Sequence, residues 1–209
     1  MGGARRTDES MLLWDVAGAL GEPEWRVRRA AFHSIQERVA STVPELADAT
    51  GLNEDAVEKA ISKLVGAGMA VVDDGGRVVG SAGLSLVPGR HRLRLGGNDF
   101  FTWCAIDALG IPAALESDAL AVTSCPTCGR AIEVEVRRGR LGVDPRLRAW
   151  LPRQECCSSV IDEACPDMNL FCTDEHLEVW RRERGAPDGI ALSIPEVEEL
   201  GRIWWGDLA

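Results

Sequence analysis

Residues 44–79 carry the pattern that most constrains the fold, two short helices followed by a hairpin. Residues 44–50 favour a first helix, Gly51 a turn, and Asn53 the N-cap of a second helix. The second helix has one apolar face, made of Val57, Ala60, Ile61, Leu64 and Val65. Gly66 and Gly68 end it, and residues 69–72 and 77–79 flank a turn at 73–76, as in a hairpin. This order is typical of a winged helix.

The rest of the chain predicts strands mixed with helices. Residues 119–123 and 131–136 alternate enough to be strands, and residues 195–205 predict a helix that packs Trp204 and Trp205 onto the core. With 209 residues and 45% hydrophobic content, the chain can bury such a core. We therefore expect an α+β protein. A winged-helix-like helical domain would cover residues 1–80, and a mixed α/β domain with a mostly antiparallel sheet would cover residues 81–209.

Cys104 and Asp107 form the chain's best clue to chemistry. Asn98 or Asp99 could cap a helix over this segment, and Pro112 should lie outside its interior. Such a helix would place the thiol and the carboxylate on one face, where the carboxylate can take the thiol's proton and return it to a substrate. The plainer alternative is that Cys104 is a small buried residue and Asp107 is a surface group.

The sequence around this pair resembles the organomercurial lyase family. Its Trp-Cys-Ala-x-Asp motif is matched by residues 103–107, and a following leucine-containing stretch with a proline is matched by residues 108–112. An upstream Gly and Leu pattern is matched by residues 80–86. Cys125 and Cys165 stand about where the family has its downstream cysteines. The resemblance covers roughly residues 25 to 200.

This resemblance implies protonolytic cleavage of carbon–mercury bonds, giving a hydrocarbon and Hg(II). Cys104 and Cys165 would be the two thiolates and Asp107 the proton shuttle, and all three would hold the Hg(II) product. Thiolates suit mercury because both are soft. No cofactor beyond small thiols is implied. The partners would be a small organomercurial substrate and a thiol protein that accepts Hg(II), such as a mercuric reductase.

Two departures from the family pattern leave alternatives open. Pro166 follows Cys165 where relatives often have another cysteine, so the second thiolate could instead be one of three nearby residues: Cys156, Cys157 and Cys172. The other departure is the Cys125-Pro-Thr-Cys128-Gly turn, which resembles half of a zinc knuckle.

Zinc at Cys125 and Cys128 would need two more ligands. Clustered candidates are Cys156, Cys157, Cys165 and Cys172. Structural zinc, a disulfide and unligated thiols in a hairpin loop all remain open, and zinc that recruited Cys165 would count against the lyase hypothesis. His176 lies beside Asp174 and Glu175 and is expected to be a solvated surface residue.

Charge argues against DNA as a partner, although a winged helix could belong to a metal-responsive repressor. The second helix opens with Asn53-Glu54-Asp55, the net charge is −10, and neither half of the chain carries a basic excess. No apolar run is long enough to span a membrane, and the N-terminus lacks a signal-peptide pattern. The chain has seven cysteines and no export signal, so we expect it to be in the cytoplasm with its thiols reduced.

The main rival hypothesis is a thiol-based metal-binding or metal-sensing protein on the same scaffold. A third hypothesis keeps the thiol chemistry but assigns it a different natural substrate.

Overall fold

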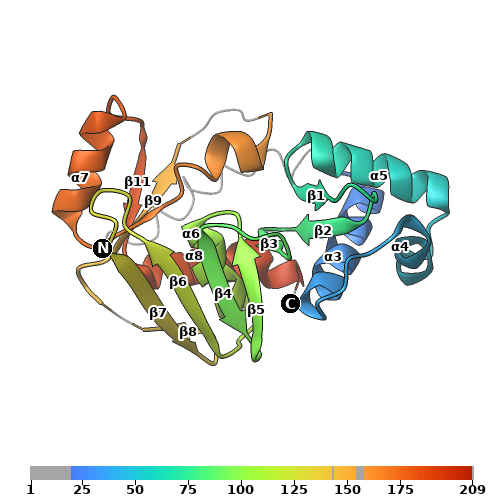
Figure 1. Ribbon diagram of the computed structural model, residues 1–209, viewed down its shortest axis with the longest axis horizontal. Coiled ribbons are helices and arrows are strands. Elements are labelled where there is room, and N and C mark those ends of the chain that lie inside the picture. Colours follow the sequence, from blue (N-terminus) through green and yellow to red (C-terminus); the bar gives the residue numbers. More distant parts are fainter. Residues whose placement is uncertain (1–19, 143, 154–157, 209) are drawn as a thin grey trace.

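A computed structural model of the chain describes residues 20–142, 144–153 and 158–208 (Figure 1). Its helices are α3 (Glu22–Gln36), α4 (Val43–Thr50), α5 (Glu54–Gly66), α6 (Ala105–Ala114), the π-helical turn η2 (Val160–Ala164), α7 (Asp174–Glu183), α8 (Ile194–Trp205) and the 3₁₀ turn η3 (Gly206–Leu208). Its strands are β1 (Ala70–Val72), β2 (Val78–Ser81), β3 (Leu84–Ser85), β4 (His91–Leu95), β5 (Asn98–Thr102), β6 (Ala119–Ser124), β7 (Ala131–Arg137), β8 (Arg140–Leu141), β9 (Arg148–Pro152), β10 (Leu170–Phe171) and β11 (Gly189–Leu192).

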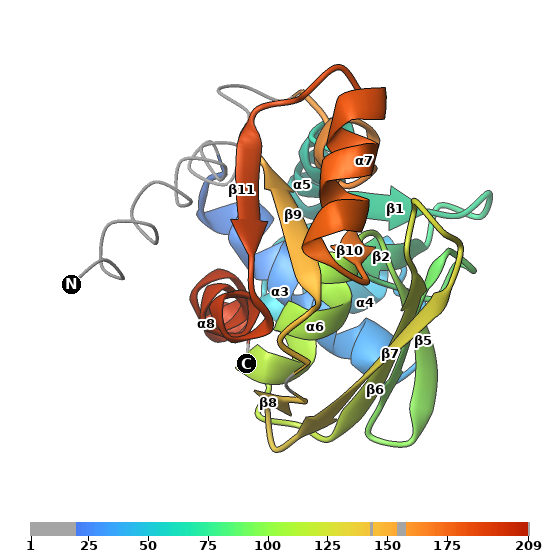
Figure 2. The same cartoon turned by 90° about the vertical axis from the view of Figure 1, so that its left-hand side faces the viewer.

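The strands form two antiparallel sheets. The larger has the order β1-β2-β3-β5-β4-β6-β7-β8, and the smaller has the order β10-β9-β11. Helices α6 and α8 lie against one face of the larger sheet, with α6 between α8 and the strands (Figure 2). The expected α+β class with a mostly antiparallel sheet is therefore confirmed. Within the described residues, no helix combines the length and apolar character needed to cross a bilayer.

The helices and hairpin expected over residues 44–79 are present. The side chain of Asn53 caps α5 by accepting the backbone N–H of Ala56 at 2.9 Å, and Gly51 has a φ of +68° after α4. Val65 was expected on the buried apolar face of α5, but it is 38% exposed at the edge of that face. The other four members of that face are buried: Val57, Ala60, Ile61 and Leu64.

The hairpin β1–β2 is continuous with the larger sheet. Ser81 of β2 pairs with Leu84 of β3, and Leu84 pairs with Thr102 of β5. Hydrogen bonding therefore runs across residue 80, where the sequence predicted a boundary. The division into domains 1–80 and 81–209 stays a prediction.

The segment before Cys104 is a strand, and the prediction of a helix over it was wrong. Asn98 and Asp99 lie in β5 and cap no helix, and the helix begins only at Ala105. Phe100, which pairs with Leu93, belongs to a run of aromatic and β-branched residues that favours a strand. Strands on both sides of β5 supply its backbone partners, and this tertiary pairing outweighs the helical pattern.

Pro112 also departs from expectation, because it lies inside α6. A proline removes one backbone donor, a local cost that packing against α8 can offset. That packing is close, since a Cβ atom built on Gly201 would lie 2.5 Å from the Cα of Gly110. Trp205 of α8 is 1% exposed and its Nε1–H donates to the carbonyl of Ala82 at 2.7 Å. The expected packing of the C-terminal aromatic helix onto the core is confirmed.

Candidate active site

Cys104 and Asp107 begin helix α6 as a reciprocal cap. The backbone N–H of Cys104 donates to Asp107 Oδ2 at 2.8 Å, and the backbone N–H of Asp107 donates to Cys104 Sγ at 3.3 Å. A capping box of this kind fixes both side chains at the helix N-terminus. The thiol and carboxylate are thus adjacent, as the sequence indicated. They meet because they cap the start of α6, and not because they share one face of a longer helix.

Cys165 is brought to this pair by the π-helical turn η2. It follows the turn directly, and its backbone N–H donates to the carbonyl of Val160 at 2.9 Å. Gly68 allows this turn to approach the end of α5, because a Cβ atom there would lie 2.7 Å from the backbone nitrogen of Val160. Short π-helical turns are frequent at functional sites.

The ligand atoms of Cys104, Asp107 and Cys165 all lie within 4.8 Å of one another. The three residues are 0%, 6% and 4% exposed, so the surface location considered for Asp107 is excluded. Of the other candidates for second thiolate, Cys172 belongs to a different group of side chains, described below, and Cys156 and Cys157 lie outside the described residues. The structure therefore brings together the three residues singled out from the sequence.

Burial controls the protonation of this group. It raises the pKa of Asp107 to about 7, against hydrogen bonds from Cys104 that favour the carboxylate. It also raises the pKa of Cys104 well above that of a free thiol, and hydrogen bonding to Cys165 and the charge of Asp107 act in the same direction. For Cys165, the hydrogen bond with Cys104 lowers the pKa, but burial and the charges of Asp107 and Asp162 leave it raised. A metal-free site therefore favours neutral thiols beside a carboxylate that can accept a proton near neutral pH.

Arg28 places a buried positive charge near Asp107. It is 2% exposed, and among the described residues its Nε and Nη1 atoms have no hydrogen-bond partner. Burial lowers its pKa to about 10, while the charge of Asp107 acts in the opposite direction. The same attraction lowers the pKa of Asp107. Arg28 therefore limits how far burial raises the pKa of the carboxylate.

Gly83 closes the site from the loop between β2 and β3. Its φ is +90°, and a Cβ atom there would lie 2.6 Å from Asp107 Cγ. Both the backbone conformation and the lack of space require glycine. Its carbonyl accepts the backbone N–H of Trp103 at 3.2 Å, which ties this loop to the residue before Cys104.

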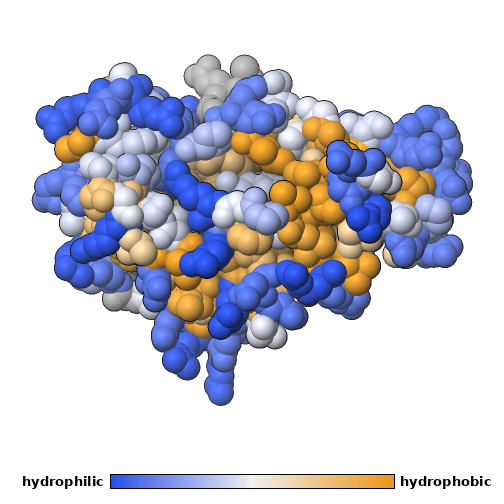
Figure 3. All heavy atoms as spheres, viewed as in Figure 1, coloured by the Kyte–Doolittle hydropathy of each residue, from blue (hydrophilic) through white to orange (hydrophobic). Residues whose placement is uncertain are grey.

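A cavity of about 330 Å³ reaches the group from the side of Cys165. It is lined mainly by apolar atoms, and Val71, Val87, Trp103 and Ile161 contribute to its wall. The guanidinium of Arg90 also lies at this wall, close enough for its charge to interact with Cys104. Figure 3 shows apolar residues gathered on this face, over β1 to β3. A small apolar molecule fits such a site.

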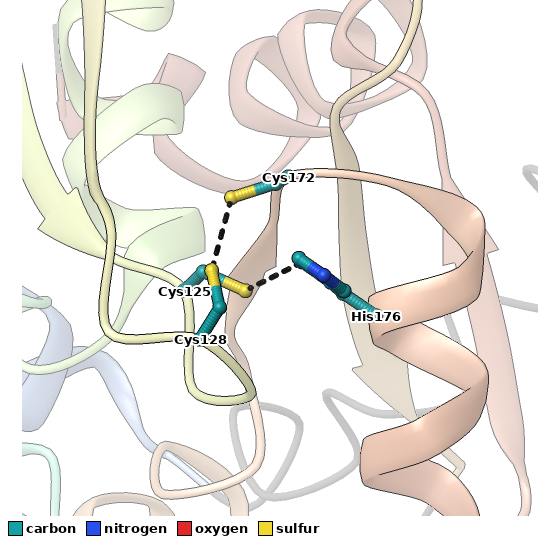
Figure 4. A group of neighbouring side chains, drawn as sticks. All are labelled: Cys125, Cys128, Cys172 and His176. Atoms are coloured by element: carbon teal, nitrogen blue, oxygen red, sulfur yellow. Dashed lines mark hydrogen bonds between the residues drawn. The ribbon is translucent and has the colours of Figure 1, made fainter.

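A second group of potential ligands joins the β6–β7 loop to the start of α7: Cys125, Cys128, Cys172 and His176 (Figure 4). His176 corrects the sequence analysis, because its Nδ1 lies 3.6 Å from Cys125 Sγ and the residue is only partly exposed. The missed signal was the Cys172-x-x-x-His176 spacing at a helix start, which puts both side chains on one side of the turn. Cys165 is not a member of this group.

Comparison with known proteins gives the family. The family model for alkylmercury lyase matches residues 84–206. The chain belongs to the alkylmercury lyase family. An alkylmercury lyase of Bacillus cereus is 28% identical over 164 residues, 78% of this chain and 72% of that protein. One of Staphylococcus epidermidis is 27% identical over 181 residues, 86% of this chain and 81% of that protein.

A solved structure supports the same family. The mercury-bound form of MerB2 superposes with a TM-score of 0.86 at 25% sequence identity, covering 97% of this chain and 98% of that one. The family match spans Cys104, Asp107 and Cys165 together with the second group of ligands. The N-terminal helices lie outside the match to the family model but within the extent of the structural match.

Proposed function

We propose that this member of the alkylmercury lyase family cleaves carbon–mercury bonds by protonolysis. The observation that carries the proposal is the buried group of two thiols and one carboxylate beside an apolar cavity. Thiols are soft ligands that suit mercury, and a carboxylic acid can supply the proton that replaces the metal on carbon. The apolar wall suits the organic group of the substrate.

Cys165 makes the first contact in this proposal, because it lines the cavity while Cys104 is completely buried. An organomercurial carried by a small thiol exchanges its ligand: the Cys165 sulfur bonds to mercury, and the thiol proton leaves with the displaced small thiol. Asp107 then accepts the proton of Cys104, whose sulfur becomes the second thiolate on mercury. Coordination to a metal favours this ionisation by stabilising the thiolate.

The second thiolate pushes electron density onto the carbon bound to mercury. Protonated Asp107 gives its proton to that carbon, the electron pair of the carbon–mercury bond forms the new carbon–hydrogen bond, and the hydrocarbon leaves. Asp107 returns to the carboxylate, and Hg(II) stays on Cys104 and Cys165. Two incoming thiols then remove the ion and restore the protons of both cysteines.

The product must therefore pass to other thiols. We propose that small thiols or a thiol protein of the mercuric reductase kind accept the Hg(II) ion. The five cysteines among the described residues are unpaired, which suits a reducing compartment, and we propose the cytoplasm.

The test is anaerobic incubation of the purified protein with phenylmercury and excess small thiol, with benzene measured in the headspace. We expect repeated turnover, that is, more benzene than protein. Phenylmercury incubated with the same excess of small thiol but without protein serves as the control and should release no benzene on the same time scale. Tight binding of phenylmercury without benzene would reject the lyase and favour the metal-binding hypothesis.

Arg28 provides a test of the carboxylate's role through pH. Asp107 must be ionised to accept the thiol proton, so we expect kcat/KM to rise with pH through about 7. Arg28→Met removes the charge that favours the carboxylate, and the rise should move to higher pH by about one pH unit. Arg28→Lys retains the positive charge, so its pH profile should lie close to that of the parent. A profile that is unchanged in Arg28→Met would contradict this electrostatic role.

A further inference from the structure

The second group of ligands shares no residue with the group of Cys104, Asp107 and Cys165, and it has no part in the proposed reaction. Cys125 and Cys128 stand on the loop between β6 and β7, Cys172 follows β10, and His176 lies in the first turn of α7 (Figure 4). Figure 4 shows the three sulfurs and the imidazole pointing toward a common centre. All four ligand atoms lie within 4.8 Å of one another.

Two separations within this group match the edges of a metal-centred tetrahedron. Zinc–sulfur bonds of about 2.3 Å and zinc–nitrogen bonds of about 2.0 Å give edges of about 3.8 Å between sulfurs and about 3.5 Å between sulfur and nitrogen. Cys128 Sγ and Cys172 Sγ are 3.7 Å apart. Cys125 Sγ and His176 Nδ1 are 3.6 Å apart.

The backbone around Cys125 is arranged for a thiolate. Three backbone N–H groups donate to its sulfur, from Thr127, Cys128 and Cys172. Burial raises the pKa of this thiol, but these bonds outweigh burial and lower the pKa to about 6. Gly129, with a φ of +71°, closes the loop by donating its N–H to the carbonyl of Cys125 at 2.9 Å.

Other contacts hold the two halves of the group together. The hydroxyl of Thr127 donates to the carbonyl of His176 at 2.7 Å, and Thr173 caps α7 by accepting the N–H of His176. Arg130 hydrogen bonds with the side chain of Cys172, and the charge of Arg146 is also close to that side chain. These two cations can balance the excess negative charge of three thiolates around a divalent ion.

We propose that Cys125, Cys128, Cys172 and His176 bind one structural Zn(II) ion. Three thiolates and one imidazole in tetrahedral geometry are a typical zinc ligand set, and four protein ligands make a closed structural site with no position for a substrate. The ion joins the β6–β7 loop to β10 and α7, elements separated by more than forty residues. It also keeps three thiols from competing with Cys104 and Cys165 for mercury.

This inference is independent of the lyase reaction, because its test uses no mercury. We expect the full-length protein, expressed with zinc available and purified under reducing conditions, to contain about one zinc per chain. Cys128→Ser and His176→Ala should each lose most of it. Cys104→Ser removes a thiol from the other group and His33→Ala removes an exposed histidine, so both should retain it.

Spectroscopy of the unmodified protein covers the case in which a variant fails to fold. X-ray absorption at the zinc edge should show three sulfur neighbours and one nitrogen neighbour, and cobalt(II) replacement should give the intense visible bands of a tetrahedral thiolate site. Chelation should lower the melting temperature, and zinc should restore it. Protein that is folded and zinc-free when isolated and does not take up zinc would overturn the proposal, as would a Cys128–Cys172 disulfide in that protein or retention of zinc by Cys128→Ser.

Discussion

Replacing Cys104 with serine should abolish cleavage of phenylmercury, with benzene release falling by at least about 10³-fold. A serine hydroxyl is a hard, weakly acidic group, so it neither binds mercury strongly nor gives its proton to Asp107 at neutral pH. Cys165 remains at the cavity, and the variant should still take up one equivalent of phenylmercury. Headspace analysis for benzene and mercury analysis of the desalted protein measure the two properties separately.

The fold of Cys104→Ser must be checked in the same samples. Serine can still accept the N–H of Asp107 as a helix cap, so its melting temperature and zinc content should stay close to those of the parent. Near-normal benzene release by a folded Cys104→Ser protein would remove Cys104 from the reaction. Cys165→Ser, measured alongside, should instead weaken the uptake of phenylmercury.

Replacing Asp107 with asparagine should separate mercury binding from cleavage. Both sulfurs remain, so the variant should bind phenylmercury, but it has no carboxylate to accept and return a proton. We expect cleavage slower by about 10²- to 10⁴-fold, the usual contribution of a positioned acid or base. Rapid mixing followed by benzene analysis would detect a single slow turnover. The matched control is Asp74→Asn, the same change at an exposed position in the β1–β2 turn, and it should cleave at the parental rate.

The Asp107→Asn variant should also be more stable than the parent at alkaline pH. The folded-state pKa of Asp107 is about 7, above its ordinary 3.8, so the folded protein holds this proton more tightly than the unfolded chain. Stability should therefore fall as pH rises from about 4 to about 7, and the full cost of the buried charge remains above that range.

Asparagine carries no charge, so Asp107→Asn should gain on the order of 2–4 kcal/mol over the parent at pH 8 and little near pH 4. Urea unfolding at the two pH values measures the difference. If the stability difference between Asp107→Asn and the parent were equal at the two pH values, burial would not raise the pKa of the Asp107 carboxylate.

The sequence could predict the local elements whose signals are local. Asn53 caps α5 through its own side chain, and Gly51 takes the left-handed conformation that ends α4, so the helices over residues 43–66 follow from their own residues. The same holds for the turn between β6 and β7, which lies between two strands of clear alternation. At residues 98–102 the prediction of a helix was wrong, because this segment pairs with β4 across the two-residue Gly96-Gly97 turn and with β3 on its other side.

For the candidate site, the sequence by itself determined the adjacency of Cys104 and Asp107, since two residues three positions apart at a helix start can cap one another whatever surrounds them. Its resemblance to a family pointed to Cys165. Only the tertiary structure decided that Cys165, and not Cys172, meets this pair, and that Cys172 joins His176 in the second group. It also decided the burial that raises the pKa of Asp107 and the place of Arg28 beside it. The physical reason is range: capping and turn preferences act within a few residues, whereas desolvation, charge pairing and metal geometry depend on which distant segments packing brings together.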